Sequence, residues 1–241
     1  MSPRADTSGT HAVADDYFSA RSLRFLRRLA ANNARPWFQA HRADYEAHVR
    51  EPFLRLVGDL QPALAAISPH YRADPRKQGG SLFRIHRDAR YSRDKSPYKT
   101  WQGARFFHER RREVASPSFY VQLQPGGSFV GAGIWQPEPE VQRRIRQFIF
   151  DNPAGWQAAI GAPRVRASFV LEREGSMVRA PRGYPADSPL IEDLKLRSWT
   201  LWRPLDDATV VGPGLRAALE ADFATLAPLV DYLCAALDLD F

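Results

Sequence analysis

The spacing of apolar residues changes along this chain from a helical period to an alternating one and back, which restricts the possible folds strongly. Near the start, Leu23, Leu26 and Leu29 recur every three residues, as on one face of a helix. Near the end, apolar residues recur every three or four positions at Leu215, Leu219, Phe223, Leu226, Val230, Leu233 and Leu237. Between these ends, alternation predicts strands at residues 82–87, 104–108, 119–124, 128–135 and 198–203.

The order of these segments predicts the fold class. Further helical patterns cover residues 137–150, 153–160 and 188–195, and weaker strand patterns cover residues 169–171 and 177–179. Helices therefore come first, strands follow, and mixed elements close the chain. This order favours a single α+β domain over residues 15–241, with helices packed on a central antiparallel or mixed sheet. A parallel sheet is disfavoured because helices and strands do not alternate regularly.

Turn residues refine this prediction. Asn32 and Asn33 tolerate left-handed backbone and should end the first helix. Glu51-Pro52 should interrupt or kink the helical pattern that begins near Pro36. The sequence Pro-Gly-Gly at 125–127 should join two strands as a hairpin, and the glycines at 131 and 133 indicate a bulge or a close backbone approach.

Length and composition indicate a folded, soluble protein. The chain has 241 residues, and no stretch approaches the roughly 18 consecutive apolar residues that would span a membrane. Residues 1–14 are small and polar, so we expect a disordered tail without the apolar core of a secretory signal, and a cytoplasmic location. The one cysteine, Cys234, excludes an internal disulfide and a cysteine-based metal site, and its apolar surroundings predict a core residue.

The positive charge of the chain is concentrated in one stretch. Residues 84–112 contain ten Lys or Arg and three acidic residues, a net charge of +7 that equals the net charge of the whole chain. Such a concentration favours an anionic partner, either a small molecule or the phosphate backbone of a nucleic acid.

The first part of this stretch, residues 84–99 (the basic segment below), combines cations with tyrosines. Arginine matches the paired oxygens of phosphate and carboxylate groups, and tyrosine adds a hydroxyl donor and a ring face. Asp88 lies between two arginines and should stay ionised, so its simplest role is to orient a guanidinium. The segment must fold back on itself for its cations to converge. The predicted ligand-binding residues are Arg84, Arg87, Asp88, Arg90, Tyr91, Lys95, Tyr98 and Lys99.

Other candidate sites are weaker. The six histidines are scattered, and His41 and His48 are seven residues apart, which does not suit a shared metal ion, so no metal site is predicted. No glycine-rich phosphate loop occurs, because Gly79-Gly80 lacks the Lys-Ser/Thr that should follow. Several tryptophans could stack bases, and Trp101 adjoins the basic segment, but most of them are more simply core residues.

The basic segment resembles the signature of the domain of unknown function (DUF) 2461 family, which is mainly bacterial. The resemblance rests on Arg84-x-x-Arg87-Asp88-x-Arg90, an aromatic residue at 91, Lys95 and Tyr98, and on Gly131-x-Gly133-x-Trp135-x-Pro137. Phe25-Leu26, Asn32-Asn33, Trp37-Phe38 and Tyr45 also match, so the resemblance covers roughly residues 17–237. Tyr91 departs from the phenylalanine usual in the family. The family has no assigned activity that the resemblance could transfer to this chain, and the cofactor stays unknown.

Three functions therefore remain open from the sequence. The leading one is binding of a phosphate-bearing or other anionic ligand by the basic segment. The second is an enzyme acting on an anionic, phosphorylated substrate, with Asp88, Tyr98 or a histidine moving protons. The third is a basic protein-interaction module, which should show a broad flat patch. Against all three stands a structural interpretation, in which the Arg-Asp pairs only attach a loop to the sheet.

Overall fold

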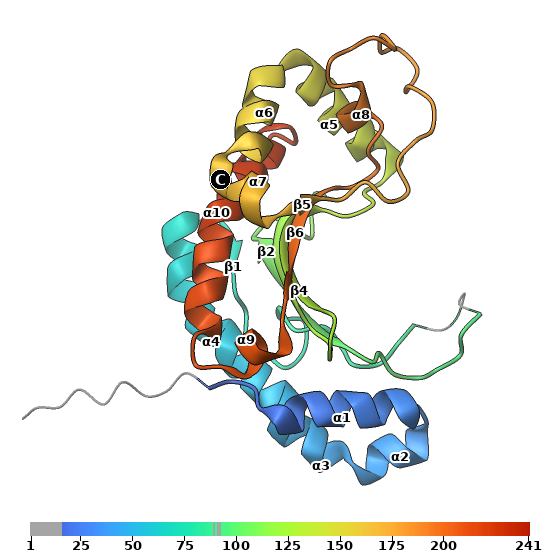
Figure 1. Cartoon of the computed structure of the whole chain (residues 1–241), viewed down its shortest axis with the longest axis vertical. Coiled ribbons are helices and arrows are strands. Elements are labelled where there is room, and N and C mark those ends of the chain that lie inside the picture. Colours follow the sequence, from blue (N-terminus) through green and yellow to red (C-terminus); the bar gives the residue numbers. More distant parts are fainter. Residues whose placement is uncertain (1–15, 89, 91–92) are drawn as a thin grey trace, which may run out of the picture.

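A six-stranded antiparallel sheet with the order β1-β2-β3-β4-β6-β5 forms the centre of the protein (Figure 1). The computed structural model describes residues 16–88, 90 and 93–241. The strands are β1 (Tyr71–Arg72), β2 (Gln102–His108), β3 (Ser118–Leu123), β4 (Ser128–Ile134), β5 (Val170–Leu171) and β6 (Trp199–Leu205).

Helices precede, interrupt and follow these strands. The first group is α1 (Ala20–Ala31), α2 (Arg35–Ala40), α3 (Arg42–Tyr45), a π-helical turn η1 (Glu46–Arg50) and α4 (Glu51–Ile67). The second group lies between β4 and β6 and comprises α5 (Pro139–Asp151), α6 (Pro153–Gly161), α7 (Pro163–Ser168) and α8 (Ile191–Leu194). The last two are α9 (Asp207–Val211) and α10 (Leu215–Ala235). The predicted single-domain α+β class is confirmed.

One face of the sheet carries the core. On this face β3 presents Phe119, Val121 and Leu123, all buried, and α10 packs against it (Figure 1). Phe223 of α10 lies with its ring centroid 5.1 Å from the centroids of both Phe106 and Phe119. Truncating such a fully buried phenylalanine to alanine costs about 3–5 kcal/mol, so this cluster is a main source of stability.

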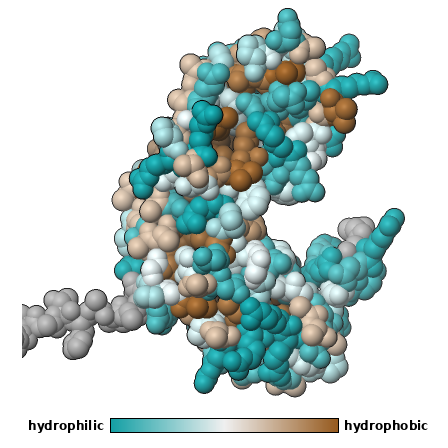
Figure 2. All heavy atoms as spheres, viewed as in Figure 1, coloured by the Kyte–Doolittle hydropathy of each residue, from teal (hydrophilic) through white to brown (hydrophobic). Residues whose placement is uncertain are grey.

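The opposite face of the sheet is open. Its residues come from the alternate positions of each strand, and cross-strand register places Arg105 beside Tyr120, Tyr120 beside Gly131, and Gly131 beside Trp202. Helices α5–α8 stand at one end of this face, while α1–α3 and the basic segment stand at the other (Figure 1). Figure 2 shows the deep notch that results.

Glycine allows β4 to approach β6 closely. A Cβ atom at Gly133, where φ is +128°, would lie 2.0 Å from the backbone oxygen of Trp199. The predicted close backbone approach is confirmed, and pairing runs without a bulge from Ser128↔Leu205 to Ile134↔Trp199. The hairpin of β3 and β4 around residues 125–127 is confirmed as well.

Several local predictions were wrong. Residues 82–87 form no strand but two isolated bridges, Leu82↔Ala104 and His86↔Tyr98, because the side chain of Gln102 takes the carbonyl of Phe83. Residues 177–179 form no strand either. The first helix ends at Ala31 as expected, but with φ −133° at Asn32, outside the left-handed region. Of the two outcomes expected at Pro52, the interruption does not occur, because the helical path passes through the π-helical turn η1 into α4.

The described residues also bear on the other predictions. Cys234 is buried in the core, as predicted. Within the part of the chain described, no helix has both the length and the apolar composition needed to cross a bilayer. The predicted tail at residues 1–14 and the predicted ligand residue Tyr91 lie outside the described residues.

Candidate functional site

The basic segment folds back on itself, as its proposed convergence requires. The backbone N–H of Arg87 donates to the carbonyl of Pro97 at 2.9 Å, and the N–H of Lys99 donates to the carbonyl of Ile85 at 2.8 Å. These bonds close a hairpin-like reversal whose two ends, Arg84 and Lys99, lie side by side.

The base of this reversal is anchored in the core. The side chain of Tyr98 is only 2% exposed and stacks on Phe38 with a ring-centroid distance of 4.1 Å. Asn33 lies in the turn between α1 and α2, and its amide donates to the carbonyl of Tyr98 at 2.9 Å and accepts from the N–H of Tyr98 at 3.1 Å. Tyr98 was predicted to bind the ligand, but its burial makes it an anchor that holds the segment in place.

Two ion pairs join described charged residues near the tip of the basic segment. Arg90 donates to both carboxylate oxygens of Asp88, at 2.9 and 2.7 Å, and Arg87 pairs with Asp94. The hydrogen bonds from Arg90 lower the pKa of Asp88 to about 2, and the hydrogen bonds from Ser96, followed by those from Arg87, lower the pKa of Asp94 to about 2. Both carboxylates are therefore ionised at neutral pH, and both pairs are exposed. Lys95 joins this tip by donating to the carbonyl of Arg90 at 3.4 Å.

Lys99 connects the basic segment to the open face of the sheet. Its Nζ donates to the carbonyl of Arg84 at 3.0 Å and lies 5.2 Å from the ring centroid of Phe83 and 5.0 Å from that of Trp101. Burial, and then the charge of Arg84, lower the pKa of Lys99. The Arg84 side chain is exposed, and its guanidinium has no hydrogen bond or ion pair with any described residue. The charge of Arg84 therefore acts on Lys99 at this end of the open face.

From this end, five half-buried aromatic side chains continue across the open face. Successive ring centroids lie 6.4, 5.9, 5.4 and 6.1 Å apart, and neighbouring ring planes are inclined by 64, 39, 43 and 71°. This aromatic row consists of Trp101, Phe83, Tyr120, Phe129 and Trp202, in that spatial order. Of its members, the sequence singled out only Trp101 as a neighbour of the basic segment.

The position of Tyr120 depends on a glycine in β2. A Cβ atom at Gly103 would lie 2.3 Å from the Tyr120 hydroxyl, so any other residue there would displace the ring of this tyrosine. The hydroxyl donates to Gln122 at 2.9 Å, and the amide of Gln122 donates to Gln124 at 2.8 Å. Burial raises the pKa of Tyr120, so its hydroxyl remains a proton donor at neutral pH.

Arg105 adds a further cation to the open face. It lies beside Tyr120 in the β2–β3 register, and its Nη2 donates to the carbonyl of Ser116 at 3.1 Å. Its Nε is buried without a hydrogen-bond partner among the described residues. Burial and the charge of Arg111 lower the pKa of Arg105. The open face therefore combines aromatic rings with positive charge.

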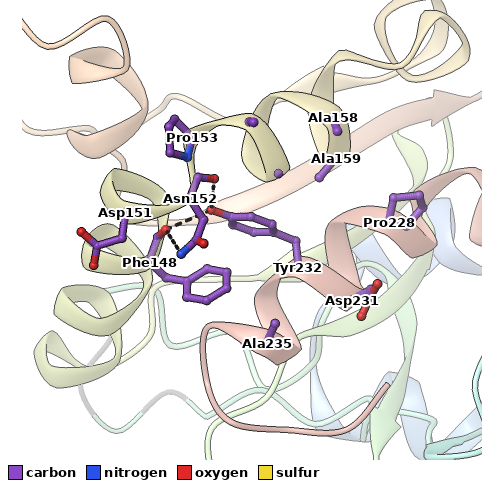
Figure 3. A pocket seen from close by; sticks show the side chains of 12 residues that line it. Phe148, Asp151, Asn152, Pro153, Ala158, Ala159, Pro228, Asp231, Tyr232 and Ala235 are labelled. Atoms are coloured by element: carbon purple, nitrogen blue, oxygen red, sulfur yellow. Dashed lines mark hydrogen bonds between the residues drawn. The ribbon is translucent and has the colours of Figure 1, made fainter.

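A separate surface pocket of about 660 Å³ lies between α10 and the junction of α5 and α6. Figure 3 shows the side chains that line it. Tyr232 crosses it and donates to the carbonyls of Phe148 and Asn152, at 3.2 and 3.1 Å. Its charged lining residues are Asp151 and Asp231, which repel anions. This pocket therefore does not suit the kind of partner that the basic segment favours.

The histidines among the described residues take packing or surface positions. His41 stacks on Trp37 with centroids 4.1 Å apart, and His108 is buried against the carbonyl of Asp240. Among the described residues, no three His, Cys, Asp or Glu side chains are grouped so that they could hold a metal ion.

Comparison with known proteins identifies the family of the chain from its sequence. No match was found among curated proteins or among solved structures. A family model with the description "conserved hypothetical protein (DUF2461)" matches residues 21–232, which include the sheet, the basic segment and the whole aromatic row. The chain belongs to the DUF2461 family.

Proposed function

We propose that the protein binds a phosphate-bearing ligand where the basic segment meets the aromatic row. The observation that carries this proposal is the position of Lys99, whose ammonium group lies over the rings of Phe83 and Trp101 and beside the exposed Arg84. A ligand with an anionic group and an adjoining apolar or aromatic part suits this combination.

Electrostatics favour an anion at this position. Arg84 and the partly buried Lys99 repel each other, and burial makes the charged form of Lys99 less stable. A phosphate between them would offset both effects and accept charge-assisted hydrogen bonds, which are roughly twice as strong as neutral ones. The carbonyl of Arg84 uses one of the three ammonium protons of Lys99, which leaves two for a ligand.

The remaining charged residues of the tip would extend the same site. Arg87, Arg90 and Lys95 supply further cations, while Asp88 and Asp94 hold the two guanidinium groups in fixed orientations. Because Asp88 is exposed, its ion pair contributes little to stability, and orientation of Arg90 is the role that its geometry supports. With pKa values of about 2, both carboxylates are poor proton acceptors at neutral pH, which favours binding over proton transfer.

Thermal unfolding with and without pyrophosphate tests this proposal. A ligand at 100 times its dissociation constant stabilises a protein by about 2.7 kcal/mol, so saturating pyrophosphate should raise the Tm of the parent protein. Lys99→Gln and Arg84→Gln should each remove most of this rise.

Arg110→Gln provides the matched control. It removes an equal charge from the opposite end of β2, where Arg110 pairs with Glu113. That end lies about 20 Å away, at roughly 3.3 Å per strand residue. If all three variants lose the same part of the rise, the effect is diffuse electrostatics and the proposed site is wrong. The absence of any rise in the parent protein would favour a purely structural role for the basic segment.

A further inference from the structure

We propose that the anion bound by Arg84 and Lys99 is the backbone of a single-stranded nucleic acid, whose bases stack on the aromatic row. This inference rests on the proposed function and names the class of ligand. Proteins that bind single strands commonly combine cations that follow the backbone with aromatic side chains on which the bases stack. The open face of the sheet brings both elements together.

The geometry of the aromatic row suits separate bases. Three of its five rings are contributed by β3, β4 and β6, a fourth is Trp101 just before β2, and the fifth is Phe83 beside the Leu82↔Ala104 bridge. Each ring is in contact with the next. Neighbouring ring planes differ by 39–71°, so the row is not one flat surface. Bases that point away from one another can each stack on a different ring, whereas bases held in the parallel stack of a duplex cannot. The row therefore favours an unpaired strand.

The distribution of charge favours a nucleic acid over other polymers that stack on aromatic residues. Lys99 lies over the Trp101–Phe83 end of the row, and Arg105 lies beside Tyr120 in its middle. A neutral polysaccharide would gain little from these cations, whereas a nucleic acid presents a phosphate at every nucleotide. The sheet face that carries the row borders the notch of Figure 2, and a notch admits a strand more readily than a broad protein surface.

Polar groups beside the row can contact base edges. The side chains of Gln122 and Gln124 are partly exposed and continue the hydrogen-bond chain that begins at the Tyr120 hydroxyl. Amide groups donate and accept, so they can meet the edge of any base after a small rotation. Stacking is likewise tolerant of base identity, and we expect weak sequence preference.

The test is a fluorescence-anisotropy titration with a labelled oligothymidylate of roughly 10 nucleotides, a length within the range that one small nucleic-acid-binding fold covers. The parent protein should bind it saturably and more tightly than it binds a duplex of the same length. Trp202→Leu and Phe129→Leu should each weaken binding by roughly 5- to 150-fold, the range expected for loss of one base–aromatic stack.

Matched variants isolate the contribution of stacking. Trp202→Phe keeps an aromatic ring and should bind within a few-fold of the parent. Trp202→Leu should retain the parental Tm within a few degrees, so that its loss of binding reports the missing ring and not a loss of fold. Trp135→Leu should bind like the parent, because Trp135 is 59% exposed and contacts no ring of the row. Lys99→Gln should also flatten the slope of log affinity against log salt by about 0.7, the value for one phosphate contact on a single strand.

The outcomes separate this inference from the proposed function. If Trp202→Leu and Phe129→Leu bind like the parent while Lys99→Gln binds weakly, the anion site stands and the stacking role is refuted. If the parent ignores the oligonucleotide but pyrophosphate still raises its Tm, only the nucleic-acid assignment fails. If a neutral oligosaccharide binds in its place and depends on Trp202, the row is a sugar site and the inference is wrong. If neither pyrophosphate nor the oligonucleotide binds, both proposals fail.

Discussion

The substitution Asn33→Ala tests whether the basic segment owes its position to one side chain outside it. Within the described residues, the backbone N–H and carbonyl of Tyr98 have no partner other than the Asn33 side chain, at 3.1 and 2.9 Å. Asn33 is 65 residues away in sequence, so this contact joins the turn after α1 to the base of the segment. Alanine removes both hydrogen bonds at once.

The expected cost follows from these two bonds. A typical hydrogen bond contributes about 1 kcal/mol net, so Asn33→Ala should lower the free energy of unfolding by about 2 kcal/mol. For a chain of this size, 1 kcal/mol corresponds to about 2–4 °C, which predicts a fall in Tm of about 4–8 °C. Calorimetry measures this fall directly. Because the segment loses its anchor, the rise in Tm caused by pyrophosphate should also shrink.

The neighbouring Asn32→Ala is the matched control. The side chain of Asn32 makes one exposed hydrogen bond, to the carbonyl of Arg28 within α1, and does not touch the basic segment. It should change Tm by a smaller amount and leave the effect of pyrophosphate intact. Equal losses of stability in the two variants, or an unchanged pyrophosphate effect in Asn33→Ala, would refute the idea that Asn33 positions the segment.

Three further predictions concern charge and reactivity. Asp88→Asn should leave the Tm of the ligand-free protein nearly unchanged, because the pair with Arg90 is exposed, but should reduce the rise caused by pyrophosphate; a large loss of Tm without ligand would contradict this role. Pyrophosphate affinity should fall as pH rises through the pKa of Lys99, which is lowered from the usual 10.5, because only the protonated amine attracts the anion. Titration calorimetry at several pH values should show this fall in the parent and not in Lys99→Gln. Burial raises the pKa of Cys234 to about 11, so a thiol reagent at pH 8 should label this cysteine only after unfolding, and rapid labelling of the native protein would show that the site opens.

Local patterns in the sequence predicted the regular elements well. The β3–β4 hairpin followed from alternation on both sides of Pro125-Gly126-Gly127, and α10 followed from its long apolar stripe. Both signals depend only on residues near in sequence. Residues 82–87 also alternate, yet they form no strand, because a side chain from elsewhere, Gln102, takes the carbonyl of Phe83. A hydrogen bond between residues far apart in the sequence does not affect the spacing of apolar residues, so the sequence pattern cannot reveal it.

The candidate site was predictable only where it depends on residues near one another in the sequence. The charge of residues 84–112 and the reversal of the basic segment could be inferred from composition and turn residues. The burial of Tyr98 could not, because it depends on Phe38 and Asn33, which only the fold brings near. The aromatic row likewise joins separate segments, and knowing that Tyr120 and Phe129 share a face with Trp202 requires the order and register of the strands.

The central claim is that an anion binds between Arg84 and Lys99, and a diffraction measurement tests it most directly. Crystals soaked in selenate or tungstate, whose anomalous scattering marks the anion, should show a peak at the roughly 2.7–2.9 Å of a charge-assisted hydrogen bond from the Lys99 Nζ and the Arg84 guanidinium. The same peak should be absent in Lys99→Gln crystals of the same form. A peak only elsewhere on the basic surface, for example near Arg110, or none in the parent protein, would contradict the account.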